Sequence, residues 1–477
     1  MAQSFPEVTI IGAGLAGSEA ALQLAARGVP VRLVDMRPRV STPVHRSAAP
    51  AELVCSNSLK SKDATTAAGC LKYELGVLGS QLLAAAWDTS VPAGGALAVD
   101  RTRFSHEVAR MLDGSERIER VCSECVALPD GPAIVATGPL TSEALAAELQ
   151  EACGAESLAF YDAAAPIVEA DSLDRSIVFA QSRYGKGDGA DYLNAPMNRD
   201  EYEAFVAELL AARRVIEKDF ERRELFAACQ PIEEVARTGT DALSHGALKP
   251  VGLTDPRTGA RPWAVVQLRA ENAACSAYNL VGFQTNLRFG EQERVFRMVP
   301  GLEHAEFSRY GVMHRNTFLD APHVLTRALS LPGHPQLHFA GQVTGTEGYL
   351  EAVASGLFAA LAVYAQLASV PEPHLPVDTL FGCLLDYATD PQTQGYQPMH
   401  VNYGILAPLE PRIRNKRERK AAYARRARAA ADAFVASRPD LFEQAFVVDA
   451  AFSRMPRERT LQGLVGLDGS QSGERLQ

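Results

Sequence analysis

The chain has 477 residues, of which 47% are hydrophobic and 22% charged, and its formal net charge at neutral pH is −10. This composition excludes an intrinsically disordered chain and a small disulfide-framed secreted domain, and the length predicts two or three domains. The longest apolar stretch, 357–370, is too short to span a bilayer and no basic-then-apolar leader precedes the first strand, so we expect a cytoplasmic protein outside the membrane.

The first predicted element is a strand, glycine turn and helix, VTIIGAGLAGSEAALQLAARGVPVRLVD, over residues 8–35. Gly12 permits a tight turn, Gly14 lets the backbone approach a pyrophosphate, and Gly17 lets the helix pack closely on the strand. The phosphates would lie at the helix N-terminus, and Asp35 is placed to accept hydrogen bonds from a ribose diol. The segment predicts a dinucleotide-binding unit with contacts from Gly12, Ala13, Gly14, Leu15, Ala16, Gly17 and Asp35.

Cys55 follows the second strand of this unit in the segment ELVCSNSLKS, residues 52–61. Flavin disulfide reductases of the glutathione-reductase type carry a Cys-x4-Cys pair at this place, but here Lys60 occupies the second position. The substitution argues against dithiol exchange and for a single thiol beside a flavin, with Ser56, Asn57 and Lys60 able to favour the thiolate.

A second contribution to the same domain is predicted from PAIVATG, residues 132–138, a strand and turn that bring Gly138 to the nucleotide. Just before it, Cys122 and Cys125 form a single CxxC in a predicted strand. Because no second pair or histidine accompanies them in the sequence, we expect no metal site.

Residues 151–324 are predicted to form an inserted α+β domain. Charged residues at helical spacing over 199–225 predict a helix, whereas WAVVQL at 263–268 and YNLVGF at 278–283 predict strands. Cys229 follows the charged helix in FAACQPIEEVARTG and is a candidate nucleophile. A small buried apolar side chain is the alternative for any single cysteine.

The chain is predicted to return to the first domain over residues 336–360, QLHFAGQVTGTEGYLEAVASGLFAA. This pattern indicates a short strand, a glycine turn and a long apolar helix, the arrangement with which two-part flavoproteins close over the flavin. The helix N-terminus near Tyr349 would face the flavin pyrimidine, where reduction deposits charge, and the Tyr349 ring could lie against the flavin. FAD is the predicted cofactor, and its contacts here are Gly341, Gln342, Gly348 and Tyr349.

These elements predict an α/β protein with a Rossmann-like FAD-binding domain of the glutathione-reductase type, formed by residues 1–150 and 325–477 around the insertion. A basic helical segment, RIRNKRERKAAYARRAR, lies at 412–428 and holds nine basic residues against one acid, which leaves −18 on the rest of a chain of net charge −10. A basic helix on an acidic body attracts a polyanion, and a solvated helix face is the alternative.

Several of these strings resemble the folate- and FAD-dependent tRNA (uracil-5-)-methyltransferase family. The resemblance rests on GAGLAGSEAA, ELVCSNSLKS, ALAVDR, FAACQPIEEVARTG, FAGQVTGTEGYLEAVASGL and YQPMHVNYGILAPLE followed by RNKRER, in order along nearly the whole chain. Two departures are Asp35, where a glutamate is usual, and the extended tail after the basic helix.

The resemblance implies transfer of the methylene carbon of 5,10-methylenetetrahydrofolate to uracil C5 in the T-loop of tRNA, with electrons from reduced FAD and NAD(P)H as the reductant. By the same resemblance, Cys229 adds as a thiolate to uracil C6, which turns C5 into a nucleophile. Cys55 then packs against the isoalloxazine or assists proton transfer, although the two cysteines could exchange roles.

The partners implied are tRNA, through its T-arm, and folate, with no membrane and no obligate protein partner. The reacting uridine must leave its stacked loop, so a flipped base is expected. The predicted phosphate contacts lie in the basic segment and are Arg412, Arg414, Lys416, Arg417, Arg419 and Lys420.

Three alternatives are open to the sequence alone. The first is a flavin-dependent enzyme that modifies the wobble uridine of tRNA. The second is an NAD(P)H-dependent flavin oxidoreductase acting on a small molecule or a disulfide, in which the basic helix has no role. The third is an RNA-binding protein in which FAD is structural. His45 and Asn286 are possible folate contacts.

Overall fold

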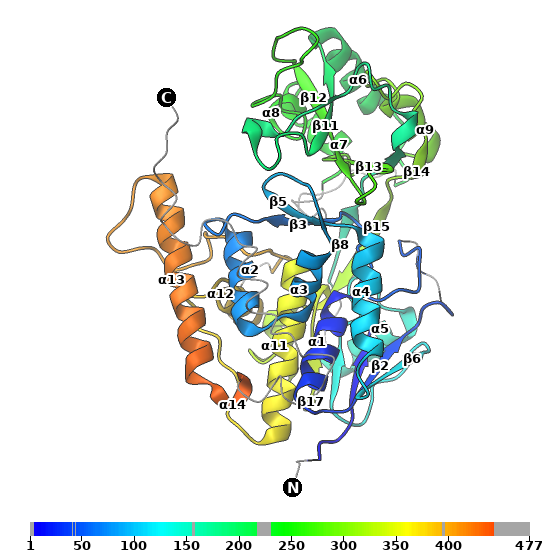
Figure 1. Cartoon of the computed structure of the whole chain (residues 1–477). Coiled ribbons are helices and arrows are strands. Elements are labelled where there is room, and N and C mark those ends of the chain that lie inside the picture. Colours follow the sequence, from blue (N-terminus) through cyan, green and yellow to red (C-terminus); the bar gives the residue numbers. More distant parts are fainter. Residues whose placement is uncertain are drawn as a thin grey trace.

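The computed structural model describes residues 4–40, 42, 44–154, 158–216, 230–393 and 396–442. Two separate hydrophobic cores organise these residues: one is built from both ends of the chain, and the other lies within residues 165–305. Figure 1 shows the second body (green) resting on one end of the first. The predicted arrangement, a Rossmann-like domain with an α+β insertion, is the fold observed.

The first domain is built on a six-stranded sheet in the order β16-β17-β7-β1-β2-β6. All neighbouring strands are parallel except β16 and β17, so the carboxyl ends of the parallel strands meet along one edge, where α/β proteins bind their ligands. The strands are β1 (Val8–Ile11), β2 (Val31–Asp35), β6 (Ile118–Cys122), β7 (Ala133–Val135), β16 (Ser330–Leu331) and β17 (His334–Phe339).

Helices cover this sheet, and two of them, α1 and α11, pack together at the centre (Figure 1). A Cβ atom placed on Gly356 of α11 would lie 2.1 Å from the carbonyl oxygen of Ala16 in α1, so the two backbones touch. The helices are α1 (Leu15–Ala26), α2 (Ala67–Leu78), α3 (Gln81–Asp88), α4 (Arg101–Asp113), α5 (Glu143–Cys153), α10 (Ala321–Val324), α11 (Tyr349–Ala368) and α12 (Leu380–Thr389).

The apolar stretch 357–370 predicted from the sequence forms the second half of α11 and the turn after it. By length and composition α11 could cross a membrane, but 83% of its most apolar window is buried inside the protein. Its apolar surface is therefore taken up by the core of the first domain.

Two buried carboxylates fasten helices to one another. Glu19 of α1 accepts hydrogen bonds from the Gln81 and Leu82 backbone N–H groups at the start of α3, at 3.0 and 2.8 Å. Glu74 of α2 accepts from the Leu380 and Phe381 N–H groups at the start of α12, at 2.7 and 3.1 Å. Both satisfy helix N-termini, although burial raises the pKa of each, that of Glu74 to about 7.

Two small sheets connect the domains. β3 (Ser58–Ser61), β5 (Ala96–Val99) and β4 (Ser90–Val91) form a three-stranded sheet beside the insertion, and β8 (Leu158–Ala163) pairs with β15 (Met313–Phe318) where the chain enters and leaves it. Phe318 to Val324, at the end of the predicted insertion, pack in the core of the first domain.

The insertion is an antiparallel sheet, β10-β11-β12-β13-β9-β14, flanked by helices. The predicted strands are confirmed as β12 and β13, but the predicted helix 199–225 ends earlier, because Ala212 is extended and Arg214 bridges to Leu287. The elements are β9 (Ile167–Glu169), β10 (Phe179–Ala180), β11 (Tyr192–Met197), α6 (Arg199–Ala211), α7 (Ile232–Arg237), α8 (Ala242–His245), β12 (Ala264–Ala270), β13 (Ala277–Leu280), α9 (Phe289–Phe296) and β14 (Phe307–Arg309).

The basic segment forms α13 (Lys416–Ser437), followed by the short α14 (Pro439–Phe442). α13 packs on α2 through its alanines and Phe434, and Tyr73 of α2 donates to Asp432 at 2.9 Å. Its far end lies beside the end of α1, where the Arg27 guanidinium donates to the Leu441 carbonyl. The basic start of α13 therefore lies at the end of the domain nearer the insertion (Figure 1).

Candidate functional site

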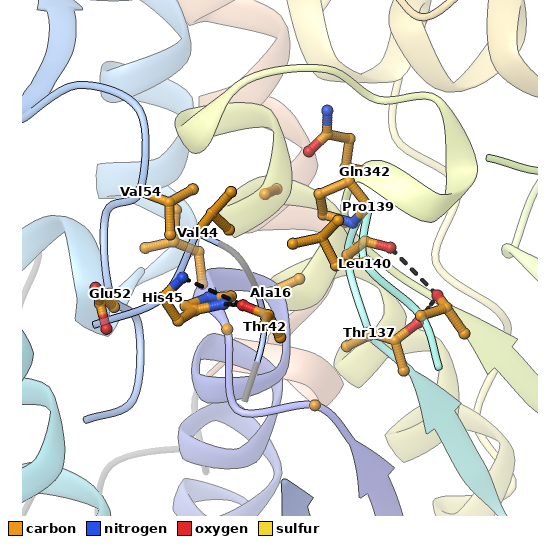
Figure 2. Close-up of a pocket in the computed structure, with 18 of the residues that line it drawn as sticks. Ala16, Thr42, Val44, His45, Glu52, Val54, Thr137, Pro139, Leu140 and Gln342 are labelled. Atoms are coloured by element: carbon orange, nitrogen blue, oxygen red, sulfur yellow. Dashed lines mark hydrogen bonds between the residues drawn. The ribbon is translucent and has the colours of Figure 1, made fainter. Parts of the chain in front are cut away.

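A cavity of about 390 Å³ opens over the carboxyl edge of the parallel sheet. Its walls come from the turns after β1, β2 and β7, from the start of α11 and from the loop that precedes β3. Figure 2 shows His45, Glu52 and Val54 along one wall and Thr137, Leu140 and Gln342 along the other, with Ala16 between them. Segments more than 300 residues apart in sequence thus enclose one elongated space.

The floor of the cavity is the glycine turn before α1. Gly12 has φ +103°, and a Cβ there would lie 2.5 Å from the Ala136 carbonyl oxygen, while a Cβ on Gly17 would lie 1.9 Å from the oxygen of Gly12. No atom lies within 4 Å of the Cβ position of Gly14, which is the N-cap of α1 and has no side chain to cover the helix end. The backbone N–H groups of α1 therefore face the cavity, as an anion site requires.

Asp35 ends β2 and lines the cavity, but its oxygens already have partners. One oxygen accepts from the Ala13 N–H at 2.8 Å, and the Arg37 guanidinium donates to both oxygens at 3.0 Å. Burial alone would raise the pKa of Asp35, but Arg37 outweighs burial and holds that pKa below its ordinary value. Asp35 is thus a carboxylate at neutral pH, and a ribose would share it with Arg37.

The chain returns to the cavity after β17, as predicted. Gly341 has φ +80° and its N–H donates to Ser355 Oγ at 2.7 Å, which fixes the turn against α11. Gln342 lines the cavity and donates to Glu347. Gly348, with φ +115°, is the N-cap of α11, so the start of that helix also faces the cavity.

Tyr349 does not extend freely along the cavity, because its hydroxyl is bound to the Cys55 loop. The phenol oxygen accepts hydrogen bonds from the Cys55 and Ser56 backbone N–H groups at 2.8 and 3.0 Å. Burial raises the pKa of Tyr349, so the phenol stays protonated at neutral pH. Tyr349 therefore fixes the Cys55 backbone at the start of α11.

Cys55 is half-buried and lines the cavity. Arginines surround its loop: Arg101 donates to the Cys55 carbonyl at 3.4 Å and pairs with Glu271, and Arg269 donates to Ser56 Oγ and Asn57 Oδ1 at 2.7 Å. Burial lowers the pKa of Arg269, whereas for Arg101 the Glu271 carboxylate outweighs burial and raises the pKa. The thiol thus lies in a positive environment.

Lys60, which the sequence predicts to favour the Cys55 thiolate, pairs with a buried acid. Its ammonium lies 3.3 Å from Oε1 of Glu351, a residue of α11 with no exposed surface. Beneath it, Lys72 of α2 donates to the Leu59 and Ser61 carbonyls at 2.6 and 2.8 Å, and burial, aided by Lys60, lowers its pKa to about 7. These groups hold β3 against the start of α11.

The two possible folate contacts have different surroundings. His45 lines the cavity, and Figure 2 shows its ring nitrogen bonded to Thr42 Oγ1, at 2.7 Å. Burial and the charge of Arg37 lower the pKa of His45 to about 4, so the ring is neutral at pH 7. Asn286 is 1% exposed and bonds the Ile216 backbone and the Glu233 carboxylate, which is a structural role inside the insertion.

Most of the residues predicted for the cofactor line this cavity, as does the predicted catalytic residue Cys55: Gly12, Gly14, Leu15, Ala16, Asp35, Gly138, Gly341, Gln342, Gly348 and Tyr349. Ala13 and Gly17 shape it from behind. Cys229 lies outside the described residues, between Ile216 and the start of α7. Cys125 lies beyond the end of β6, contrary to the prediction that the CxxC is within a strand.

The six predicted RNA contacts do not line the cavity. Arg412, Arg414, Lys416 and Arg417 are exposed and Lys420 is half-exposed, whereas Arg419 donates to the Ile413 and Arg414 carbonyls at 3.2 Å. Asn415 caps α13 by accepting from the Arg417 and Glu418 N–H groups. The exposed cations form a basic surface at the start of α13.

A second, more open groove of about 960 Å³ lies on the insertion. It is lined by residues from the ends of β11 and α8 and from the loop before β12, among them Arg199, Lys249 and Trp263. Of the residues predicted for cofactor, catalysis or RNA that the structure describes, none lines it.

Arg101 and Arg269 had no role in the sequence-based prediction. Arg101 lies in ALAVDR, directly after β5, and Asp100 caps α4 by accepting from the Arg103 N–H. Arg269 lies within a strand of the insertion, where alternation gives no sign that its side chain meets Ser56. Only the contact between the domains brings them to Cys55.

A family model described as "Glucose inhibited division protein A" matches residues 7–371. The chain is 52% identical over 423 residues to "Methylenetetrahydrofolate--tRNA-(uracil-5-)-methyltransferase TrmFO" of Moorella thermoacetica, covering 88% of this chain and 96% of that protein. It is 52% identical over 432 residues to the enzyme of that name from Geobacter sulfurreducens, covering 90% and 99%.

Solved structures of Aquifex aeolicus GidA have the same fold. The form I crystal aligns with a TM-score of 0.66 at 15% identity, covering 93% of this chain and 78% of that one. The form II crystal aligns with a TM-score of 0.65 at 14% identity, covering 92% and 75%.

Proposed function

The chain belongs to the methylenetetrahydrofolate–tRNA-(uracil-5-)-methyltransferase family, and from this premise we propose that it methylates uracil C5 in tRNA with the methylene carbon of 5,10-methylenetetrahydrofolate. The observation that carries the proposal is identity of about 50% over nearly the full length of the relatives. The elongated cavity beside a thiol supports it, because the reaction needs a redox cofactor, a nucleophile and a base together.

FAD fits the elongated cavity. The uncapped start of α1 at Gly14 suits a pyrophosphate, Asp35 at the end of β2 suits a ribose, and the start of α11 at Gly348 suits the electron-rich edge of a flavin. When bound and reduced, FAD supplies the hydride that converts a methylene on C5 to methyl, and in this proposal NAD(P)H supplies the electrons.

Cys229 is the proposed nucleophile. Its thiolate adds to uracil C6, and C5 gains the electron pair and attacks the electrophilic methylene. Loss of the C5 proton then allows the bond between the methylene carbon and the folate nitrogen to break, which releases tetrahydrofolate. After hydride reduces the methylene to methyl, loss of the thiolate from C6 restores the C5–C6 double bond. α7 follows Cys229 in the sequence, and the Ile232 N–H at its start donates to the Gln284 carbonyl at 2.7 Å.

Cys55 has the complementary role. Its backbone is held by Tyr349 and its loop by Arg101 and Arg269, so its position at the cavity wall is fixed. A fixed thiol beside the reduced cofactor suits packing or proton transfer at C5.

RNA containing 5-fluorouridine distinguishes the roles of the two cysteines. Fluorine replaces the C5 proton that must be lost, so the covalent adduct at C6 persists. Wild type and Cys55→Ala should form an adduct that survives denaturation, whereas Cys229→Ala should not. An adduct in Cys229→Ala that is absent from Cys55→Ala would exchange the two roles.

We propose that the tRNA binds through its T-arm and that its phosphates contact the basic surface of α13. Arg412, Arg414, Lys416, Arg417 and Lys420 are exposed or half-exposed there, which suits contacts that position the RNA without reading its sequence. Arg419 would act by shaping the segment before the helix. The proposed setting is the cytoplasm, without an obligate protein partner.

Transfer of isotope-labelled methylene carbon to tRNA tests the function directly. The purified protein with reduced FAD and labelled 5,10-methylenetetrahydrofolate should place the label in 5-methyluridine of the T-loop, and a T-loop U→C transcript should stay unlabelled. Label in the anticodon loop would indicate a wobble-uridine enzyme. No label in any tRNA would reject the proposal.

A further inference from the structure

An arginine at the contact between the domains has no oppositely charged partner within the part of the chain that the structure describes. Arg309 ends β14 and is 7% exposed. Among the described residues, no carboxylate pairs with its guanidinium and no oxygen accepts a hydrogen bond from it. A cation with so little exposure is costly when no anion lies beside it.

Like charges face this arginine. Burial and the positive charges of Arg101 and Arg46 lower the pKa of Arg309. Arg46 is exposed, and its guanidinium donates to the Ser308 carbonyl at 3.3 Å, one residue before Arg309. Arg101 is already paired with Glu271. The exposed Arg46 and the buried Arg309 therefore approach each other across the contact between the domains.

The nearest acid of the Arg46 loop does not offset them. Glu52 accepts from the Arg46 and Ser47 backbone N–H groups at 2.9 and 3.0 Å, so its oxygens close the loop. Cys55 and Tyr349, at the cavity wall, are also near enough to Arg309 to influence its pKa. The guanidinium of Arg309 is therefore available to pair with an anion that binds beside Cys55.

We propose that Arg309 and Arg46 form a phosphate subsite that holds the RNA backbone next to the uridine being methylated. This inference rests on the proposed function, since a base that leaves its stack to reach the thiols carries its own phosphate to the rim of the cavity. Guanidinium groups match phosphate with paired hydrogen bonds, and low exposure strengthens them. The subsite is distinct from the basic surface of α13, because Arg309 ends β14 of the insertion and Arg46 lies in the loop between β2 and β3.

A cycle of protein and RNA changes tests the subsite. T-arm RNA is made with a neutral methylphosphonate at the phosphate on either side of the target uridine, and its dissociation constant is measured with wild type, Arg309→Gln and Arg120→Gln. Arg120 of β6, which forms an exposed ion pair with Asp113, is the control for loss of one positive charge. Wild type should lose about 10-fold in affinity at one of the two positions.

The losses of RNA-binding free energy caused by Arg309→Gln and by the methylphosphonate should not add. Arg309→Gln should bind native RNA about 10-fold more weakly than wild type and should show no further loss with the methylphosphonate, while Arg120→Gln should behave as wild type. Equal binding of native RNA by Arg309→Gln and wild type would overturn the proposal. The proposal would also be overturned if the fold-losses in RNA affinity from Arg309→Gln and from the methylphosphonate multiplied. A raised KM for folate with unchanged RNA binding would overturn it as well.

Arg46→Gln gives a second cycle if Arg309→Gln does not fold, since Arg46 is exposed. It should show the same lack of additivity, and additive losses would count against the subsite. Wild type that transfers labelled carbon to tRNA but shows no coupling in either cycle rejects the subsite alone. Wild type that transfers no carbon rejects the proposed function.

Discussion

The cofactor cavity and the start of α13 are built by opposite means. At the cavity, glycine backbone and helix ends form the walls, and a Cβ on Gly12 or Gly17 would collide with backbone within 2.5 Å. At α13, exposed Lys and Arg side chains project from a helix whose other face, with its alanines and Phe434, packs on α2. The first region recognises a ligand by shape and fixed N–H groups, and the second attracts one by charge. Variants should therefore separate them by size of effect and by salt dependence.

Gly17→Ala should have the largest effect, because its Cβ would lie 1.9 Å from the Gly12 oxygen. We expect a loss of more than about 3 kcal/mol in the free energy of unfolding and no bound FAD. Thermal unfolding of the apoprotein, together with the visible spectrum, measures both.

Gly14→Ala is the matched control, because no atom lies within 4 Å of its Cβ position. The apoprotein should unfold at the wild-type temperature, yet FAD should bind more weakly because the methyl group occupies the approach to the α1 N-terminus. Equal destabilisation by the two substitutions would contradict the idea that close packing, and not general glycine flexibility, requires Gly17.

Glu74→Gln tests the scaffold between the two regions, since α2 packs on both α12 and α13. Burial raises the pKa of Glu74 from 4.5 to about 7, so the folded state binds this proton more tightly than the unfolded state. Its contribution to stability is complete below pH 4.5 and is lost as the pH rises through about 7, amounting to about 3 kcal/mol. The unfolding free energies of wild type and Glu74→Gln should converge or cross over that range, and parallel curves would argue against a titrating Glu74.

Asp35→Ala should weaken FAD binding by about 10-fold, because a hydrogen bond between a carboxylate and the ribose is lost. Titration of the apoprotein with FAD at low and high salt measures the effect. The ratio of the FAD dissociation constants of Asp35→Ala and wild type should hardly depend on salt. Unchanged affinity would mean that Arg37 retains the carboxylate when FAD binds.

Replacing Arg414 and Lys416 together with glutamine should have the smallest effect, since each exposed cation contributes one phosphate contact. FAD content and unfolding should match wild type. The slope of log affinity for tRNA against log salt should fall by up to about 2. An unchanged slope would remove this end of α13 from the RNA surface.

The same difference explains what the sequence could predict. Gly12, Asp35 and Gly348 stand in local patterns of strand, turn and helix, and these patterns alone predict a nucleotide contact for each of these residues, all of which line the cavity. Arg269 and Arg309 carry no local pattern, and their meaning depends on a contact between segments over 200 residues apart. The anchoring of Tyr349 to the Cys55 loop was missed for the same reason.

Photocrosslinking from 4-thiouridine at the target position of T-arm RNA tests most directly whether the RNA base and the cofactor meet in one cavity. Mapping by mass spectrometry should place the crosslink in the peptide that contains Cys55 or in the one that contains Cys229, and FAD should change its yield. Crosslinks confined to α13, or to the groove around Lys249 and Trp263, would contradict the account.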